Sequence, residues 1–271
     1  TDMITLQLTN FCPAQIADSG QCFRFQKTED CTYRLIAGKH VLQVRKKENG
    51  DCIFDCSRTE FDRLWKPYFD LDTDYAAFIA KVPSSDLFLS NAVKAGSGIR
   101  ILRQDPWEML ITFIISQRKN IPAIKRAVDF LSQKFGEPIG DVSPPVFSFP
   151  SAKALAAQSP EILRGCGLGY RADYIYKAAC MVASGQIDLA AAAALDDDAL
   201  FALLLTIPGV GVKVANCVLL FGFHRIGAFP RDVWINRIID EEYGGSFAPV
   251  SSQVKCTLFR QQMHTFSAPV F

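Results

Sequence analysis

The alternation of apolar and polar residues predicts a small antiparallel β-sheet at the start of the chain. Short runs follow the two-residue period of β-strands and are separated by turn signals such as Gly38-Lys39 and Asn49-Gly50-Asp51. The predicted strands are residues 4–8, 22–26, 33–37, 40–44 and 52–56. We expect helices to cover one face of this sheet.

From residue 59 onward the pattern changes to the period of α-helices. Residues 107–116 are apolar nearly all round, and Asp105 and Pro106 provide an N-cap and a first helical residue, so we expect a central, buried helix there. The other predicted helices are residues 59–68, 73–81, 122–135, 151–158, 160–164, 171–184, 196–206, 213–221 and 233–243. The pattern predicts an α+β chain, with an N-terminal α+β domain (residues 1–98) and a mostly α-helical domain (residues 99–271).

Composition and charge exclude several classes of protein. Apolar residues make up 49% and charged residues 21% of the chain, which is typical of a globular protein. The net charge is only +1, so any contact with nucleic acid must come from a local patch. The nine cysteines form no CxxC pair, which indicates free thiols in a reducing compartment. No apolar run is long enough for a membrane span, so we expect a cytoplasmic protein without membrane contact.

Residues 203–220, LLLTIPGVGVKVANCVLL, predict two helices joined by a tight turn. Gly209 and Gly211 flank Val210 and allow the backbone to approach a ligand closely, and the second helix points its first N–H groups outward. Such a turn can hold a phosphate without sequence preference. Lys213 lies in the first turn of the second helix, and Asp232 follows nineteen residues later, where it can also cap helix 233–243.

The hairpin, Lys213 and Pro230-Arg231-Asp232 together resemble the helix-hairpin-helix glycosylases that carry a Gly-Pro-Asp signature. Two further segments, SGQCFRF (residues 19–25) and GYRADY (residues 169–174), are similar to motifs of the 8-oxoguanine DNA glycosylases of that superfamily. The resemblance runs from about residue 4 to about residue 243. It implies an N-terminal domain like the TATA-box-binding protein, followed by a helical helix-hairpin-helix domain. Ile121-Pro122 and residues 68–72 look most like the bacterial branch, which implies a bacterial cytoplasm beside nucleoid DNA.

The resemblance implies a base-excision repair enzyme that flips 8-oxoguanine out of duplex DNA and removes it. The ε-amine of Lys213 attacks the sugar C1′, and the resulting Schiff base allows strand cleavage by β-elimination. Asp232 stabilises the cationic sugar. We expect a monomer that needs no metal or cofactor for this chemistry, with a possible monovalent cation at the hairpin. The four-cysteine cluster of the iron–sulfur relatives is missing, because only Cys256 follows Asp232.

The resemblance also assigns residues to recognition of the DNA. The carbonyl of Gly20 accepts the N7–H of the oxidised base, and Cys217 lines the base pocket one helical turn after Lys213. Tyr170 wedges into the gap that base flipping leaves, and Arg171 hydrogen-bonds the orphan cytosine. The backbone of Gly209, Val210 and Gly211 binds a phosphate.

The chain departs from the family pattern at two places. Arg118 stands where the family has an asparagine that contacts the orphan cytosine, and two roles stay open for it: phosphate binding or filling of the gap. A second cytosine-reading arginine of some relatives is replaced by Ala123, so we expect weaker discrimination of the opposite base. Near the C-terminus, Gln262 and Phe266 have the spacing of the family's base-stacking pair, but in a sequence that is not helical in character.

The atypical C-terminus keeps two alternatives open. The first is a glycosylase of the same superfamily that acts on another lesion. The second is a catalytically impaired helix-hairpin-helix protein that only binds DNA.

Overall fold

The structure is a computed structural model that describes residues 2–140 and 144–245. Contacts divide the chain into two compact units. Among the described residues, 2–35, 42–103 and 226–245 form the N-terminal unit, and 36–41, 104–140 and 144–225 form the helical unit. The predicted α+β class, a small antiparallel sheet followed by a helical domain, is confirmed.

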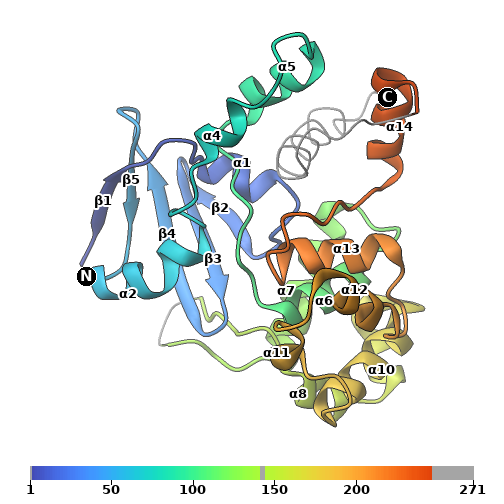
Figure 1. Cartoon of the computed structure of the whole chain (residues 1–271). Helices are drawn as coiled ribbons and strands as arrows, with labels where there is room; N and C mark the ends of the chain where they lie inside the picture. Colours follow the sequence, from blue (N-terminus) through green and yellow to red (C-terminus); the bar gives the residue numbers. More distant parts are fainter. Residues whose placement is uncertain (1, 141–143, 246–271) are drawn as a thin grey trace, which may run out of the picture. The chain divides into compact units, whose positions relative to one another are not determined.

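The sheet has five strands in the order β1-β5-β4-β3-β2, and Figure 1 shows them side by side. Their bounds are β1 (Ile4–Gln7), β2 (Phe25–Glu29), β3 (Thr32–Ala37), β4 (His40–Lys46) and β5 (Asp51–Phe54). β4 and β5 pair antiparallel, with Val44 opposite Phe54. Because side chains alternate along a strand, Leu42, Val44, Cys52 and Phe54 are all buried on one face of the sheet.

The second strand begins at Phe25 instead of at the predicted residue 22. Residues 19–24, which we call the Gly20 loop, lack strand structure, and Gly20 has a φ of +70° in the left-handed region. Within this loop the side chain of Gln21 makes two hydrogen bonds to backbone that is distant in sequence. Its Nε2 donates to the carbonyl of Arg100 (2.9 Å), and its Oε1 accepts from the N–H of Leu102 (2.8 Å). These side-chain bonds take the place of strand pairing.

Aromatic side chains fill the core between the sheet and the short helices that follow it. Phe54 of β5 lies 4.9 Å from Phe61 and 6.1 Å from Phe69, measured between ring centroids. The predicted helix 59–68 consists of α2 (Arg58–Glu60), a π-helical segment (Phe61–Trp65) and α3 (Lys66–Tyr68). An unpredicted helix, α1 (Pro13–Asp18), begins with a proline at its first residue.

The last described helix packs within the N-terminal unit. Helix α14 (Val233–Tyr243) shares an apolar cluster with α5 (Leu87–Gly96), built on Leu89, Ala92, Ile235 and Ile239, with Phe78 of α4 (Tyr75–Ile79) at its edge. The hydroxyl of Tyr243 also donates to the carboxylate of Asp86 (3.1 Å to Oδ2), which caps α5. Helix α5 was not predicted from the sequence.

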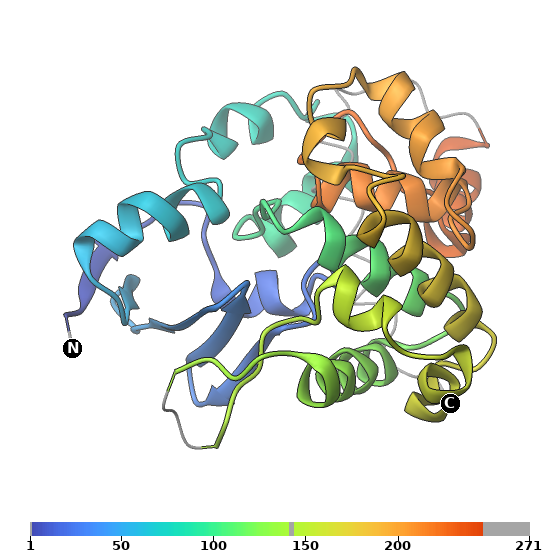
Figure 2. The same ribbon diagram turned by 90° about the horizontal axis from the view of Figure 1, so that it is seen from below.

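The helical unit is built around α6 (Pro106–Ile115), which contacts α7 (Ile121–Phe135), α10 (Arg171–Ala183) and α13 (Val212–Phe221). Asp105 caps α6, accepting from the N–H of Glu108 (2.8 Å), and residues 108–115 are buried, as predicted. Figures 1 and 2 show α6 among the other helices of this unit. These are α7 (Ile121–Phe135), α8 (Ala152–Ala156), α9 (Pro160–Leu163), a π-helical segment (Arg164–Leu168), α10 (Arg171–Ala183), α11 (Leu189–Ala192), α12 (Asp197–Leu205) and α13 (Val212–Phe221).

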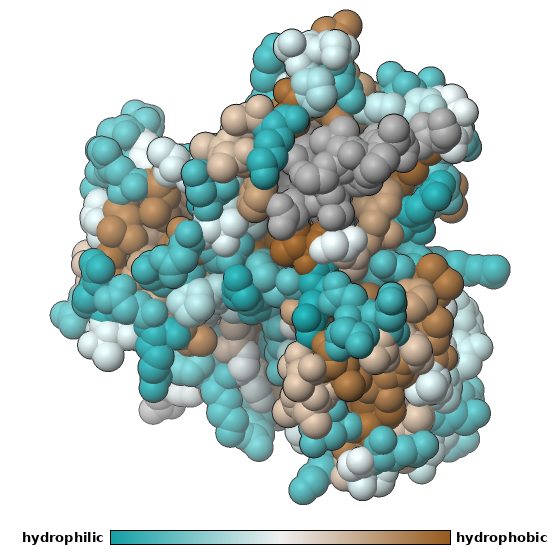
Figure 3. Space-filling view, viewed as in Figure 1, coloured by the Kyte–Doolittle hydropathy of each residue, from teal (hydrophilic) through white to brown (hydrophobic). Residues whose placement is uncertain are grey.

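The surface is mixed in character. Figure 3 shows apolar patches between hydrophilic residues on the helical unit. No helix in residues 2–140 and 144–245 is long and apolar enough to cross a membrane.

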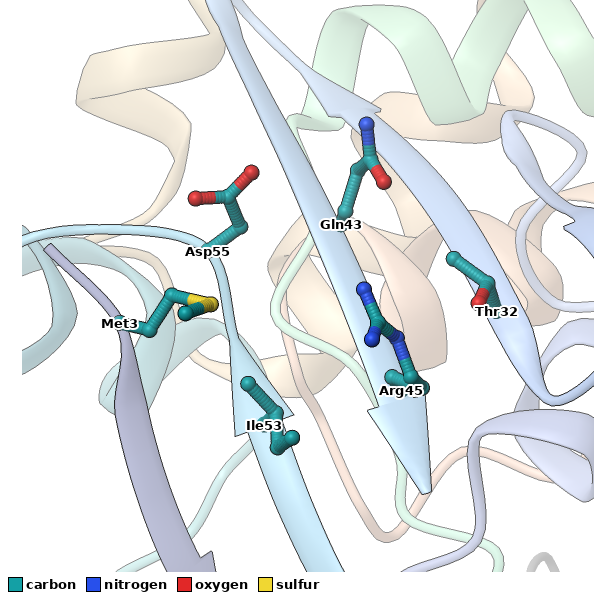
Figure 4. A pocket seen from close by; sticks show the side chains of 6 residues that line it. All are labelled: Met3, Thr32, Gln43, Arg45, Ile53 and Asp55. Atoms are coloured by element: carbon teal, nitrogen blue, oxygen red, sulfur yellow. The ribbon is translucent and has the colours of Figure 1, made fainter. Parts of the chain in front are cut away.

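A small pocket lies on the other face of the sheet (Figure 4), lined by Met3, Thr32, Gln43, Arg45, Ile53 and Asp55. Its volume of about 30 Å³ is far below the roughly 300–1,000 Å³ of pockets that hold organic ligands. This pocket therefore does not qualify as a site for a nucleobase.

Candidate functional site

Residues 206–211, which we call the hairpin, join α12 to α13 with the predicted geometry. Gly209 has a φ of +85°, and a Cβ at this position would lie 2.6 Å from Cγ of Tyr174. Gly211 is the N-cap of α13 and supplies no side-chain acceptor to the first turn. The N–H groups at the start of α13 therefore face outward without a capping side chain, which is the arrangement that binds a phosphate.

Lys213 lies in the first turn of α13, beside these N–H groups. Its Nζ lies 5.8 Å from the ring centroid of Phe113, which in turn stacks on Phe221 at 5.6 Å with an interplanar angle of 24°. Cys217 follows one turn later on the same helix and is fully buried. The amine is thus held against an aromatic surface next to a potential anion site.

Asp232 caps α14, as the sequence predicted. Its Oδ1 accepts from the N–H of Ile235 (2.9 Å), and α14 belongs to the N-terminal unit. The cap orients the carboxylate, since one oxygen is held by the helix N-terminus. Gly20 also belongs to the N-terminal unit, whereas Lys213 and Cys217 belong to the helical unit.

The Gly20 loop is held on both sides of Gly20. The hydroxyl of Ser19 donates to the carbonyl of Ile16 (2.7 Å), and Gln21 Nε2 donates to the Ser19 hydroxyl oxygen (2.9 Å) as well as to the carbonyl of Arg100. Gln21 is only 1% exposed. Because the flanking residues are fixed, the orientation of the Gly20 carbonyl is fixed with them.

A buried polar network supports the segment that Gln21 binds. Asp70 accepts from the hydroxyl of Tyr75 (3.1 Å) and from Arg103 Nη2 (2.8 Å), and the N–H of Ile101 donates to the Tyr75 hydroxyl oxygen (2.9 Å). Arg100 Nη1 donates to the backbone carbonyl of Asp70. Burial, with a smaller contribution from Asp70, raises the pKa of Tyr75, and burial lowers the pKa of Arg100. This network was not predicted from the sequence. The one residue that could have pointed to it is Gln21 of the SGQ segment, because its side chain binds the backbone that the network supports.

Tyr170 and Arg171, predicted to act at the orphan base, stand at the start of α10. Tyr170 is 47% exposed and packs edge-on against Tyr174 (6.0 Å between centroids). Arg171 is only 7% exposed, and its guanidinium lies 4.5 Å from the Tyr170 ring centroid. Arg171 Nε donates to the carbonyl of Gln117 (2.9 Å), Nη2 donates to the same carbonyl, and Nη1 donates to the carbonyl of Leu168 (3.3 Å).

Residues 116–120, which we call the 116–120 loop, connect α6 to α7 and contain Arg118. Arg118 is exposed and has a left-handed φ of +51°. Its neighbours are bonded to other loops: Gln117 Nε2 donates to the carbonyl of Gly209 (2.9 Å), and Lys119 Nζ donates to the carbonyl of Gly167 (2.9 Å). Burial and the charges of Arg171 and Arg126 lower the pKa of Lys119, which indicates a positive local field.

The predicted base-stacking pair, Gln262 and Phe266, lies outside the described residues. In residues 2–140 and 144–245, no group of three or more His, Cys, Asp or Glu side chains could hold a metal ion.

Two family descriptions match the chain in sequence. Residues 3–110 match "8-oxoguanine DNA glycosylase, N-terminal domain", and residues 111–255 match "HhH-GPD superfamily base excision DNA repair protein", where HhH denotes the helix-hairpin-helix motif.

Relatives and solved structures agree with these matches. An N-glycosylase/DNA lyase of Saccharomyces cerevisiae is 31% identical over 268 residues, which cover 89% of this chain and 70% of the yeast protein. The structure of MBOgg1 with a low-affinity DNA ligand has a TM-score of 0.88 at 35% identity and covers 97% of this chain and 96% of its own. A third match is the Clostridium acetobutylicum 8-oxoguanine glycosylase/lyase in complex with duplex DNA that contains cytosine opposite 8-oxoguanine. Its structure has a TM-score of 0.88 at 29% identity, and the match covers 98% of this chain and 99% of the clostridial chain.

The hairpin, the lysine beside it and the capping aspartate thus occur within a fold and a sequence shared over nearly the whole chain. The protein belongs to the 8-oxoguanine DNA glycosylase family of the HhH-GPD superfamily of base-excision DNA repair proteins.

Proposed function

We propose that this protein removes 8-oxoguanine from duplex DNA and then cleaves the strand by β-elimination. The observation that carries the proposal is the place of Lys213, in the first turn of α13 next to the uncapped N–H groups of the hairpin. A nucleophilic amine beside a phosphate-binding turn suits attack on a DNA sugar, because the phosphate contact positions the sugar. The names of the yeast and clostridial relatives, a lyase and a glycosylase/lyase, support the same activity.

In the proposed mechanism the neutral ε-amine of Lys213 attacks C1′ of the flipped nucleotide, and the oxidised base leaves with the electrons of the glycosidic bond. The amine then loses a proton, and the C1′–O4′ bond breaks with its electrons going to O4′, so that the sugar ring opens to a Schiff base. The Schiff base makes the C2′ proton acidic, so that β-elimination breaks the 3′ C–O bond and releases the 3′ phosphate. Asp232 stabilises the positive charge that develops on the sugar. None of these steps requires a metal or an organic cofactor.

The remaining predicted residues take roles in binding. The backbone of Gly209, Val210 and Gly211 holds a phosphate, and a monovalent cation at the hairpin would add a positive charge there. The Gly20 carbonyl accepts the N7–H that distinguishes the oxidised base from guanine, and Cys217 lines the base pocket. Tyr170 enters the gap that the flipped base leaves in the stack.

We further propose that the protein acts as a monomer beside the nucleoid DNA of a bacterial cytoplasm. Measuring the mass of the protein in solution, alone and with one duplex, tests whether it is a monomer.

Borohydride trapping tests the proposed chemistry, because reduction links only a Schiff-base intermediate covalently to the protein. The full chain is mixed with a duplex that contains one 8-oxoguanine opposite cytosine, and with an undamaged duplex. We expect a damage-dependent adduct from the wild type and from Lys153→Gln, which removes an exposed lysine of α8, and no adduct from Lys213→Gln.

Circular dichroism verifies that Lys213→Gln is folded. If the folded wild-type protein gives no adduct with 8-oxoguanine, the proposed substrate is wrong. If it then traps on a duplex with a different lesion, the alternative glycosylase specificity is correct. If it traps on none but still binds duplex DNA, the protein is the non-catalytic binding module.

A further inference from the structure

An amine and a thiol lie in contact in the helical unit, and neither takes part in the proposed activity. The Nζ of Lys134, near the end of α7, donates to the Sγ of Cys166 in the π-helical segment Arg164–Leu168, at 3.8 Å. Cys166 is only 7% exposed, and its thiol donates in turn to the carbonyl of Ile162 (3.3 Å). The pair thus brings together two nucleophilic side chains that are 32 positions apart in the sequence.

Two aromatic side chains hold the amine beside the sulfur. The Lys134 Nζ lies 5.8 Å from the ring centroid of Phe130 and 5.4 Å from that of Phe135, both on α7. An ammonium within about 6 Å of an aromatic ring centroid is attracted to the ring. The flexible lysine side chain is therefore restrained in the orientation in which its nitrogen meets Cys166.

The backbone on both sides of Cys166 is open to small solutes. Cys166 lies between Gly165 and Gly167, which are both exposed, and a Cβ on either glycine would meet no atom within 4 Å. Gly167 has a left-handed φ of +75°, and the backbone angles of Cys166 and Gly167 are not helical. Small solutes such as hydrogen peroxide can therefore reach this segment.

We propose that Lys134 and Cys166 form an oxidative modification site: peroxide converts the thiol to a sulfenic acid, and the Lys134 amine then closes a sulfur–nitrogen bond to it. The evidence is the direct contact between a nitrogen held by two aromatic rings and a buried sulfur. The proposal is independent of the proposed function, because it uses other residues and needs no DNA.

The two steps balance with one molecule of hydrogen peroxide. The Cys166 thiolate attacks one peroxide oxygen, the O–O bond breaks, and the other oxygen leaves as water with the thiol proton. The neutral Lys134 nitrogen then attacks the sulfur, and the S–O bond breaks with its electrons going to oxygen. This oxygen takes a proton from the nitrogen and leaves as a second water. The sulfur is oxidised, and the peroxide is reduced.

The contact between the two groups decides which product follows the sulfenic acid. Burial raises the pKa of the Cys166 thiol, and the charge of Lys134 acts in the opposite direction, so the first oxidation is slow. Once the sulfenic acid exists, the adjacent amine attacks it as an intramolecular nucleophile, at an effective concentration far above that of added peroxide. Bond closure is therefore faster than a second oxidation.

Peptide mass spectrometry of the full chain tests the proposal. The protein is treated with excess hydrogen peroxide at mildly alkaline pH, which favours both the thiolate and the neutral amine. The proteins are the wild type, Cys166→Ser, Lys134→Arg and Cys180→Ser. Arginine keeps the positive charge near the rings but is no nucleophile, because its guanidinium stays protonated. Cys180, a partly buried cysteine of α10, is the matched control.

We expect the wild type and Cys180→Ser to yield a linked pair of peptides that carry Lys134 and Cys166. Their mass should be lower by two hydrogen atoms than the sum of the separate peptides. Cys166→Ser and Lys134→Arg should lose this product completely, and Cys166 should accumulate as sulfinic acid in Lys134→Arg. Dithiothreitol should restore the separate peptides of the wild type, since a thiolate displaces the amine from sulfur.

A wild type in which Cys166 stays reduced, or becomes sulfinic acid while Lys134 stays free, would overturn the proposal. A disulfide between Cys166 and another cysteine would also overturn it; the mass loss is the same, but the partner peptide differs. Hydrogen exchange provides a second measurement. Residues 164–168 should exchange more slowly after oxidation than before it, and equal exchange would show that no bond ties this segment to α7.

Discussion

Tyr174 packs so closely on Gly209 that no side chain fits between them: a Cβ on Gly209 would lie 2.6 Å from the ring carbon Cγ of Tyr174. The contact joins α10 to the hairpin. It requires glycine for two independent reasons, the missing space and the φ of +85°. The neighbouring Gly211 differs, because a Cβ there would meet no atom of the protein.

These two glycines give a matched pair of variants. We expect Gly209→Ala to lower the free energy of unfolding by about 2 kcal/mol or more, since the left-handed backbone and the collision with Tyr174 both oppose the methyl group. Gly211→Ala should leave the free energy of unfolding within about 0.5 kcal/mol of the wild type but weaken duplex binding, because its methyl group would stand where a phosphate approaches. Urea unfolding and binding titrations measure the two effects; normal duplex binding by Gly211→Ala would argue against a phosphate at the hairpin.

Gln21→Leu tests whether the Gly20 loop reads the base. The substitution leaves the carbonyl of Arg100 and the N–H of Leu102 without their side-chain partner, at a cost of about 1–3 kcal/mol for each buried group. We expect the folded fraction to excise 8-oxoguanine poorly, because the Gly20 carbonyl is displaced. Borohydride trapping on an abasic site should persist, since no base is read there. Parallel loss of both reactions in a folded variant would indicate a general structural role for Gln21.

Arg171→Met should loosen the loops at the start of α10. The variant loses the bonds to the carbonyls of Gln117 and Leu168, and we expect a loss of about 1–3 kcal/mol in the free energy of unfolding. Hydrogen exchange should accelerate at residues 116–120 and 167–170 more than in α6. Lys119→Met, which loses only the bond to the carbonyl of Gly167, is the control and should accelerate exchange less. Unchanged exchange in Arg171→Met would show that these hydrogen bonds do not hold the two loops.

The stability of the N-terminal unit should fall in strongly alkaline solution. Burial raises the pKa values of Tyr75 and Tyr243 in the folded protein, with further contributions from Asp70 and Asp86 respectively. The folded state then holds these protons where the unfolded state has lost them. Their contribution is complete below the unfolded pKa of about 10 and is lost above it, by up to about 1.4 kcal/mol per pH unit for each tyrosine.

Urea unfolding between pH 8 and 11 measures this dependence. Tyr243→Phe should be less stable at pH 8, because it loses the bond to Asp86, but should have a shallower alkaline slope. An equal slope in the wild type and Tyr243→Phe would show that Tyr243 does not contribute.

Local features of the chain were predicted correctly because their causes lie within a few residues. The caps at Asp105 and Asp232 bond to N–H groups three residues away, and the apolar character of α6 is visible in its own ten residues. The hairpin is likewise a local turn that glycines permit. Together with the motifs at residues 19–25 and 169–174, these local features are enough to indicate the family from the sequence.

The tertiary structure decided what depends on partners far away along the chain. Helix α5 was missed because its apolar face is explained only by its packing against α14, more than 130 residues later. Strand β2 starts late because the Gln21 side chain is hydrogen-bonded to the backbone of Arg100 and Leu102, which lie 79 and 81 positions further along the chain. The sequence identified Arg171 as a functional residue, but its bond to Gln117, 54 positions away, shows that its guanidinium is engaged within the protein. Hydrogen bonds and apolar contacts over such separations do not appear as a periodic pattern in the sequence. The reason is that the folded backbone, and not the neighbouring residues in sequence, determines which partner a side chain meets.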